Sequence, residues 1–413
     1  MTSSWRRPAA LLTFALAIRL LALAVSAVLG TFPEYWEPEV LARNVLEGHG
    51  YVYLKLHTTY HAYMEPLYPG FVIGVYAVSG RSTVALGVAQ CLIAAFLPLV
   101  IYAFTRRTFG ETAAIAAAVL VALHPALTGY SVKFHPFVLD SVALPLVALA
   151  LLRLYETPSR TNGLLFGVAL GMCVLTRPTV LAFATIASVY LFASSAAQGV
   201  RRPLAAGLLI AALIVTPWVV RNYLVLHTFV LTRTNLGYVF WLGNHLGTSG
   251  GAADASDPTS TDSMFETAPV ELRERVLSAG EIEQNRIFLS EALGYVKEAP
   301  AEFVWRWLRK LGYFWSVAPY SGKRYARWQI VAYHAFYIGL VTAALAGIWS
   351  AWCRPVAGQG PGLALALLLP ASVSVAQALF YIEGRHRLGV EAMLAVPAGL
   401  ALARLRKRFL PGP

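Results

Sequence analysis

Residues 6–30 have the sequence RRPAALLTFALAIRLLALAVSAVLG, two arginines followed by an almost unbroken apolar run. An apolar run of about 18 residues or more can cross the hydrocarbon core of a bilayer as a helix. The run is longer than the core of a signal peptide, and no clear small-residue cleavage site follows it. We therefore expect a retained transmembrane helix, with Arg6 and Arg7 keeping the N-terminus in the cytoplasm.

The composition extends this interpretation to the whole chain. Hydrophobic residue types make up 57% of the 413 residues and charged types 13%, about half the charged share of a soluble domain. A soluble protein of this size could not bury so much apolar surface, and the same numbers exclude disorder and collagen. The sequence therefore predicts an all-α polytopic membrane protein. Many basic residues behind the net charge of +12 lie at the ends of apolar runs, which indicates membrane topology and anionic lipids rather than nucleic acid.

Ten apolar segments are candidate membrane spans within a single integral membrane domain, residues 1–413. They cover approximately residues 8–30, 82–104, 111–129, 134–154, 162–176, 178–196, 203–220, 329–351, 361–381 and 388–404. Alternation from a cytoplasmic N-terminus then places five further basic groups in the cytoplasm, as the positive-inside rule requires. These groups are Arg106 with Arg107, Arg153 with Arg160, Arg201 with Arg202, Arg354, and the cluster 404–408. We expect both termini to be cytoplasmic.

Two connections between the spans are far longer than the others. They cover residues 31–81 and 221–328, and three C-terminal spans complete residues 329–413. Both long connections fall on the outer face in this topology. Long segments between spans are usually functional, so we expect the active site on the outer face. Residues 281–296 and 301–315 have helical patterns, which predicts a long helical outer connection.

The first outer connection begins with three carboxylates, Glu34, Glu37 and Glu39. Pro38 suits the first turn of a helix, and the apolar positions of residues 40–46 predict a short amphipathic helix at the membrane interface. Favourable interaction with the helix dipole would explain Glu37 and Glu39, whereas Glu34 precedes the helix. A carboxylate at the membrane face is suited to act as a general base.

The rest of the first connection is apolar with two histidines. Residues 66–80 form an apolar run too short to span comfortably, so we expect a second interfacial or re-entrant helix there. His57 and His61 have the i,i+4 spacing that can bind a divalent metal on a helix, but spacing places no third ligand. Polar contacts to substrate or loop backbone are the preferred explanation. The sequence requires no cofactor, because it has no Rossmann glycine fingerprint and no P-loop.

Several arginines break the positive-inside trend on the predicted outer face. Arg177, Arg221 and Arg385 each lie at a helix end beside proline, tryptophan or an acidic residue. Snorkelling at a helix end would explain one such residue, but three together favour an anionic ligand near the outer headgroups. Arg387 is a fourth candidate, although pairing with a neighbouring glutamate would also explain it.

Short motifs follow one another along the alternating spans. They are the acidic start of the first outer connection, Ala42–Tyr51, Glu65–Gly70, Thr176–Pro178, Pro217–Tyr223, Thr234–Gly237 with Gly243–Asn244, and Arg385–Arg387. In this order they resemble the motifs of GT-C fold glycosyltransferases. The most similar group is the bacterial glycosyltransferase family 39 and aminoarabinose-transferase-like set, which is related to protein O-mannosyltransferases.

This resemblance implies a GT-C-like fold and transfer of a sugar from a polyprenyl-phosphate donor to a lipid, glycan or protein acceptor. In the family the first outer connection carries a catalytic aspartate or an Asp/Glu pair. Counting back from Ala42–Asn44 places this position at Glu34, with Glu37 and Glu39 as alternatives. The stretch Phe137–Ser141 is similar to a Leu-Asp-Ser stretch of the protein mannosyltransferases, which adds Asp140 to the candidates.

The resemblance also implies a mechanism, an inverting single displacement. A carboxylate takes the acceptor's proton, while arginines stabilise the departing phosphate. The expected phosphate ligands are Arg177, Arg221, Arg385 and Arg387. The expected substrate-binding residues are His57, His61, Glu65, Tyr68, Asp140, Asn235 and Asn244.

Two other functions remain as alternatives. A lipid-linked glycan ligase or polymerase would be expected to rely on a large late loop with essential arginine and histidine. A non-catalytic transporter of lipids or sugar-lipids would be expected to have charged or discontinuous spans with internal repeats, and no clear repeat is present.

Overall fold

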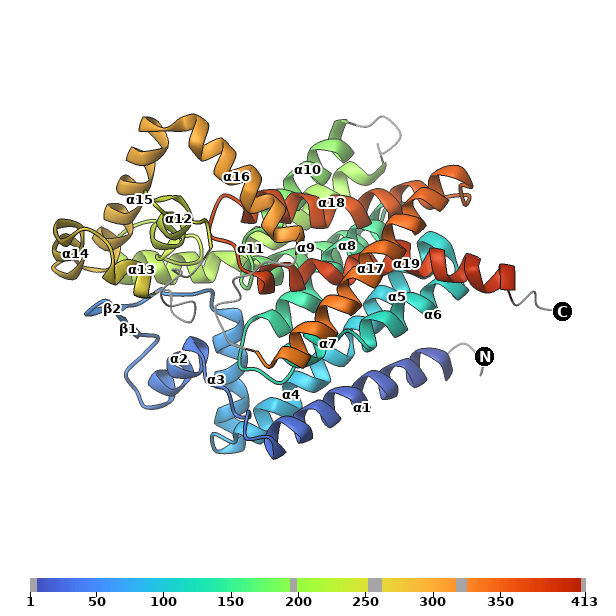
Figure 1. Ribbon diagram of the computed structural model, residues 1–413, viewed down its shortest axis with the longest axis horizontal. Helices are drawn as coiled ribbons and strands as arrows, with labels where there is room; N and C mark the ends of the chain where they lie inside the picture. Colours follow the sequence, from blue (N-terminus) through green and yellow to red (C-terminus); the bar gives the residue numbers. More distant parts are fainter. Residues whose placement is uncertain (1–5, 194–198, 252–261, 317–324, 410–413) are drawn as a thin grey trace.

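Helices make up most of the chain. The computed structural model describes residues 6–193, 199–251, 262–316 and 325–409. The long helices run side by side along the longest axis of the molecule, and both termini lie at the same end, on the right of Figure 1. The two long connections fold together at the opposite end (Figure 1). We call this part, residues 31–81, 227–251 and 262–316, the outer layer, after the predicted topology.

Within the described ranges, seven helical stretches are long and apolar enough to cross a membrane. They are α1 (Arg6–Val28), the consecutive α4 (Thr83–Ala95) and α5 (Leu97–Phe109), α8 (Phe137–Glu156), α11 (Arg201–Leu226), α17 (Arg327–Cys353), α18 (Gln359–Gln377) and α19 (Leu388–Phe409). Each of them covers a predicted span. The structure therefore confirms the all-α polytopic membrane architecture.

The three other predicted spans correspond to shorter apolar helices, α6 (Glu111–Ala122), α9 (Arg160–Val174) and α10 (Val180–Ala193). The segment predicted as one span at 111–129 is divided, because His124 caps the short helix α7 (Pro125–Tyr130) and Pro125 cannot continue the hydrogen bonds of α6. Between α9 and α10 the chain reverses at residues 176–178. Both breaks bring polar side chains into the bundle, those of His124 and Arg177.

The helices α9 and α11 pack with their backbones in contact. A Cβ at Gly167 would lie 2.3 Å from the carbonyl oxygen of Gly207, and a Cβ at Gly163 would lie 2.3 Å from that of Pro203. Small residues at such spacings let helices in a membrane approach closely, where dispersion forces rather than the hydrophobic effect hold them together. This contact fixes the position of α9 beside α11.

The first outer connection contains the two helices predicted there, α2 (Glu37–Leu46) and α3 (Leu67–Ser79). In Figure 1, α3 runs across the direction of the long helices. Between them lies an antiparallel hairpin of β1 (Tyr53–Lys55) and β2 (Thr58–Tyr60), which the sequence did not predict. Its turn is formed by Leu56 and His57, both with positive φ, so the glycine or asparagine that usually marks such a turn is missing.

The hairpin also bears on the metal-site alternative for the two histidines. His57 lies in the turn, and His61 follows β2. Their i,i+4 spacing therefore does not place them on one helix face, as a helical metal site would require.

The second outer connection is helical, as predicted. It contains α12 (Leu236–Asn244), α13 (Asp262–Glu266), α14 (Val270–Leu277), α15 (Glu281–Glu298) and α16 (Pro300–Trp315), and α12 packs against α15. After α18, the 3₁₀ turn η2 (Gly384–Arg387) leads into α19.

Hydrogen bonds to residues at the start of α15 join the two outer connections. The buried Glu281 carboxylate accepts hydrogen bonds from the backbone N–H groups of His61 at 2.7 Å and Ala62 at 2.9 Å. It also accepts one from the hydroxyl of Thr234. One turn later, Gln284 accepts a hydrogen bond from the Tyr60 hydroxyl at 2.5 Å and donates to the carbonyl of Leu56 at 3.2 Å.

We predict that Glu281→Ala destabilises the outer layer by about 2–3 kcal/mol, because it leaves one buried and one half-buried N–H group without their charged acceptor. Hydrogen exchange of the full chain in nanodiscs should show faster exchange in residues 58–64. The matched control is Glu283→Ala, whose side chain is 57% exposed and pairs with Arg286. Equal exchange in the two variants would contradict the proposed fastening.

Candidate active site

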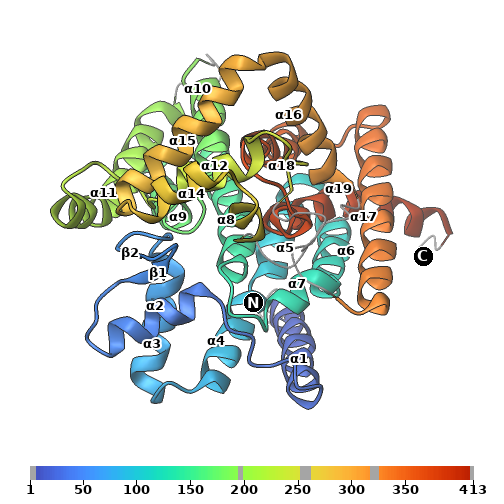
Figure 2. The ribbon, with the colours of Figure 1, turned by 60° about the vertical axis from the view of Figure 1, so that its left-hand side comes forward.

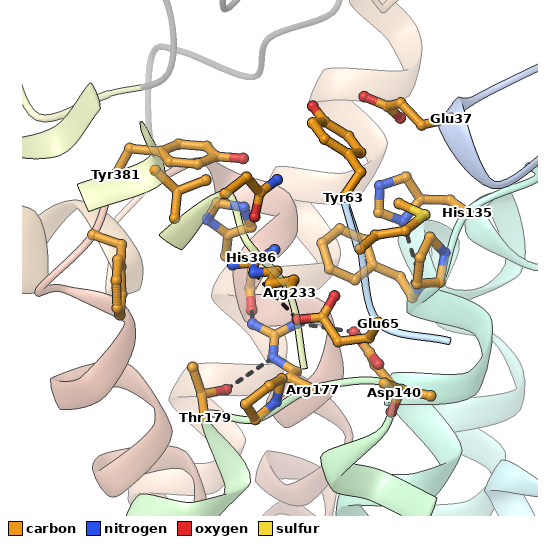
Figure 3. Close-up of a pocket in the computed structure, with 18 of the residues that line it drawn as sticks. Glu37, Tyr63, Glu65, His135, Asp140, Arg177, Thr179, Arg233, Tyr381 and His386 are labelled. Atoms are coloured by element: carbon orange, nitrogen blue, oxygen red, sulfur yellow. Dashed lines mark hydrogen bonds and ion pairs between the residues drawn. The ribbon is translucent and has the colours of Figure 1, made fainter. Parts of the chain in front are cut away.

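A cavity of about 430 Å³ lies between the outer layer and the outer-layer ends of the bundle helices. Its walls come from segments far apart in the sequence, and Figure 3 shows ten of the lining residues with labels. The lining includes Trp36, Glu37, Tyr63, Glu65, His135, Asp140, Arg177, Thr179, Arg233, Asn235, Tyr381, Glu383, Arg385 and His386.

Arg177 is fixed at the floor of the cavity. Its guanidinium donates to Asp140 Oδ2 at 3.3 Å, to the carbonyl of His386 at 2.8 Å and to Gln377 at 3.4 Å. Its Nε donates to the Thr179 hydroxyl at 3.3 Å. The side chain is 6% exposed, so these bonds replace water around a charge that would otherwise be costly to bury. Arg177 therefore links the starts of α8 and α10 to the connection between α18 and α19.

Two further arginines face the cavity. Arg233 forms an ion pair with Glu65 at 3.3 Å. Arg385 pairs with the buried Glu383, and its guanidinium lies 5.0 Å from the centre of the Trp36 ring. Burial raises the pKa of Glu383, while Arg385 opposes this rise. The cavity thus carries three guanidinium groups, each balanced by a carboxylate of the protein.

The three carboxylates of the first connection have different surroundings. Glu37 lines the cavity as the first residue of α2, and within the described ranges its carboxylate forms no hydrogen bond or ion pair. Glu34 accepts a hydrogen bond from Trp36 Nε1 at 2.8 Å and lies 3.5 Å from Lys133 Nζ. Glu39 is 4% exposed and pairs with Arg43 at 2.8 Å. Of the three, the structure brings Glu37 to the cavity, although counting along the motif had favoured Glu34.

The other predicted residues divide into two groups. Glu65, Asp140 and Asn235 line the cavity with Arg177 and Arg385. The residues outside its lining are His57, His61, Tyr68, Asn244, Arg221 and Arg387.

Most residues of the second group hold the structure together. Tyr68 is buried and donates to Gln90. Arg221 donates to the carbonyl of His61 at 2.5 Å and lies 4.9 Å from the Trp218 ring centre. Arg387 is 1% exposed, so it is away from solvent as well as from the cavity.

Arg387 belongs to a buried polar network within the bundle. It pairs with Glu391 and donates to the carbonyls of Phe314 and Ser316, each at 2.7 Å. Glu391 also lies 2.8 Å from His124 Nε2 and accepts from the Tyr333 hydroxyl at 2.5 Å. This is the glutamate pairing that the sequence offered as the other explanation of Arg387.

The side chain of Asn244 is buried beside that of Lys310. Its amide donates to the carbonyls of Phe240 at 2.8 Å and Leu379 at 2.7 Å, and its oxygen accepts from Lys310 Nζ at 2.9 Å. Lys310 also donates to the carbonyl of Gly243 at 3.2 Å. No carboxylate among these partners balances the ammonium, and burial lowers the pKa of Lys310 from 10.5 to about 7.

The cavity also contains residues that were not among the predicted site residues. His135 is a lining residue whose Nδ1 accepts from the backbone N–H of Phe137 at 3.3 Å, and burial lowers its pKa well below the usual value. Glu383, His386 and Arg233 also line it. His386 lies inside the Arg385–Arg387 motif, and Arg233 is a basic residue on the predicted outer face, so both had a signal in the sequence. His135 and Glu383 had none, because each is a single polar residue beside a helix.

The described residues offer no cluster of three or more His, Cys, Asp or Glu side chains that could hold a metal ion. The lining residues supply guanidinium groups, the ammonium group of Lys55, carboxylates, neutral donors and aromatic faces.

The chain is similar to known membrane proteins in sequence over part of its length and in fold over nearly all of it. Residues 63–220 match the family described as dolichyl-phosphate-mannose-protein mannosyltransferase. The oligosaccharyltransferase AglB from Archaeoglobus fulgidus, solved with an inhibitory peptide and a dolichol-phosphate, aligns with 99% of the chain at a TM-score of 0.57 and 14% identity. Its apo form aligns at a TM-score of 0.58. The chain spans about half the length of AglB, 51% of it.

Two other comparisons concern a second solved structure and the curated proteins. ArnT from Cupriavidus metallidurans bound to undecaprenyl phosphate aligns with 98% of this chain and 79% of its own length, at a TM-score of 0.46 and 14% identity. None of the curated proteins compared with the chain matches its sequence.

The family match covers residues 63–220, and the fold is that of AglB along almost the whole chain. Both findings confirm the predicted resemblance to GT-C fold glycosyltransferases.

We predict that the stability of the protein rises with pH because of Lys310. Between about pH 7 and 10.5 the unfolded chain binds a proton at this residue that the native chain does not, so raising the pH favours the native state. In Lys310→Met this contribution should disappear. The thermal midpoint, measured in detergent from pH 7 to 9, should rise more steeply with pH in the wild type than in the variant. Lys297→Met, at an exposed position of α15, is the control, and equal slopes in the wild type and Lys310→Met would refute the prediction.

Proposed function

We propose that this chain is a membrane glycosyltransferase that moves a sugar from a polyprenyl-phosphate donor to an acceptor at the outer face of a bacterial inner membrane. One observation carries the proposal. Two arginines of the predicted phosphate site, Arg177 and Arg385, line a single cavity with a carboxylate of the first outer connection, Glu37. The family match and the GT-C fold support the same activity, and AglB was solved with a dolichol-phosphate.

The donor phosphate is assigned to the arginine side of the cavity. Arg385 and Arg233 each pair with a single carboxylate, and their planar guanidinium groups can bind phosphate oxygens through two donors. Arg177 has its donors occupied by four protein acceptors, so its contribution is a fixed positive charge and a rigid floor. Together these groups stabilise the phosphate that leaves when the glycosidic bond breaks.

The acceptor side of the cavity is assigned to Glu37. Its carboxylate takes the proton of the acceptor hydroxyl as that oxygen bonds to the anomeric carbon, and the prenyl phosphate departs from the opposite face with the bonding electrons. The configuration at the anomeric carbon is therefore inverted, and no covalent sugar–enzyme intermediate is formed. Glu34 and Glu39 are less suited to this role, because Glu34 already accepts a hydrogen bond from Trp36 and Glu39 already pairs with Arg43.

Aromatic side chains form much of the remaining wall. Trp36, Tyr63, Tyr238 and Tyr381 all line the cavity. Their flat faces suit the apolar face of a sugar ring. They also keep water away from the anomeric carbon, which would otherwise hydrolyse the donor.

The first functional prediction concerns the base. Glu37→Gln keeps the size of the side chain and removes its basicity, so transfer should fall on the order of 100-fold or more while donor binding persists. The measurement is mass spectrometry of lipids and glycans from cells that lack the gene and carry each variant. Glu34→Gln and Glu39→Gln are the matched substitutions and should retain more activity. Normal transfer in all three single variants and in the triple variant would rule out a base in this connection.

The second prediction concerns the phosphate. Arg385→Lys keeps the positive charge but loses the planar pair of donors, so transfer should fall by about tenfold or more. Arg221→Lys is the matched control, because that arginine also lies at an outer-layer helix end but does not line the cavity. The same mass-spectrometric measurement applies to both variants. A larger loss in Arg221→Lys than in Arg385→Lys would move the phosphate site away from this cavity.

A further inference from the structure

The charged side chains that line the cavity of the candidate active site balance one another. The lining contains four basic side chains and four carboxylates. They are Lys55, Arg177, Arg233 and Arg385, and Glu37, Glu65, Asp140 and Glu383. The Nδ1 atoms of His135 and His386 each accept a hydrogen bond of 3.3 Å from a backbone N–H group, which a charged imidazolium cannot do. The described lining therefore carries no net charge.

Two of these carboxylates contact an arginine at the same atom, Nε. Glu65 Oε1 lies 3.3 Å from Nε of Arg233, and Figure 3 shows the two side chains facing each other. Glu383 pairs with Nε of Arg385. Within the described residues, the two terminal nitrogens of each arginine form no hydrogen bond or ion pair. A phosphate can therefore bind to these nitrogens while the carboxylate stays at Nε.

The two pairs come from separate parts of the chain. Glu65 precedes α3 and Glu383 follows α18, and in Figures 1 and 2 α3 lies low and α18 lies high. Glu383 is 1% exposed and the Glu65 side chain is 12% exposed, so dissolved ions screen neither charge well. The same arrangement thus occurs twice around one cavity.

The proposed reaction changes the charge of the phosphate in this cavity. In the donor the phosphate is a diester with one negative charge. When the glycosidic bond breaks, the bonding electrons remain with the phosphate, and the proton of the acceptor hydroxyl goes to Glu37. The product is a phosphate monoester with a second pKa of about 6, so it carries nearly two negative charges above pH 7. A fixed carboxylate repels this product about twice as strongly as it repels the donor.

We propose that Glu65 and Glu383 promote release of the product phosphate, a role that rests on the proposed function. Because they contact Nε, they remain beside the arginines when a phosphate occupies the terminal nitrogens. The arginines stabilise the charge that develops as the bond breaks, and the two carboxylates keep the finished dianion from binding too tightly to leave. Both carboxylates act through their charge, so neither needs to touch the substrate.

The experiment compares two probes that differ by one charge, undecaprenyl phosphate and its monomethyl ester. Binding to the full chain in nanodiscs is measured at pH 8, where the first probe is a dianion and the second a monoanion. Glu383→Gln keeps the size of the side chain and removes its charge. Its affinity for undecaprenyl phosphate should rise by about tenfold and its affinity for the monomethyl ester by about threefold, because repulsion scales with the charge of the ligand. Glu65→Gln should shift both affinities in the same direction, and it tests the proposal if Glu383→Gln does not fold.

The matched control is Glu302→Gln. Glu302 pairs with Arg306 in the outer layer, and neither residue lines the cavity. Both probes should bind to this variant as they bind to the wild type. A merely structural role of Glu65 or Glu383 would lower the affinity on substitution, so a gain in affinity identifies the effect of charge.

Two results would overturn the release role. One is that the folded Gln variants bind undecaprenyl phosphate no more tightly than the wild type does, and the other is an equal gain for the two probes. The proposed function stands in either case, provided that Arg385→Lys weakens the binding of both probes. If Arg385→Lys leaves both affinities unchanged, the phosphate does not bind at Arg385, and the release role and the assigned phosphate site fail together.

Discussion

A guanidinium group buried among apolar helices needs an acceptor for nearly every donor it has, and this requirement at Arg177 organises the outer end of the bundle. Arg177 reaches Asp140 at the start of α8, Thr179 before α10, Gln377 at the end of α18 and the backbone of η2 at His386. These partners come from three parts of the sequence, at residue 140, at residue 179 beside Arg177 itself, and at residues 377–386. Removing one acceptor would leave a buried donor without water or a partner, so their relative positions are closely determined.

The outer layer depends on a second interaction of the same kind. The N–H groups of His61 and Ala62 have no partner in a strand or helix, and the Glu281 carboxylate supplies one. Because Tyr63 and Glu65 follow directly, this contact determines where two cavity residues lie. The wall of the cavity that comes from the first connection is thus held by a helix from the second.

These constraints produce a site with two distinct surroundings. One side carries arginines that are each balanced by a carboxylate. The other side carries Glu37 at the start of a helix, with no ion pair inside the described ranges.

Much of the architecture follows from the sequence alone. Runs of apolar residues are dictated by the thickness of a bilayer, so residues such as 6–30 and 329–351 identify their helices without tertiary information. The order of short motifs was enough to predict the GT-C fold. The hairpin at residues 53–60 escaped prediction because its turn is formed by Leu56 and His57, which carry none of the usual turn chemistry.

The site itself was only partly available from the sequence. Arginines at helix ends could be recognised as candidates, but the same pattern selected Arg177 and Arg385, which line the cavity, and Arg221 and Arg387, which do not. The sequence also favoured Glu34 among the carboxylates of the first connection, whereas the fold brings Glu37 to the cavity. The sequence by itself determined the membrane-spanning helices, because bilayer thickness and apolar composition act locally along the chain. Only the tertiary structure decided which polar groups share a cavity, because that depends on how helices distant in sequence pair their buried charges.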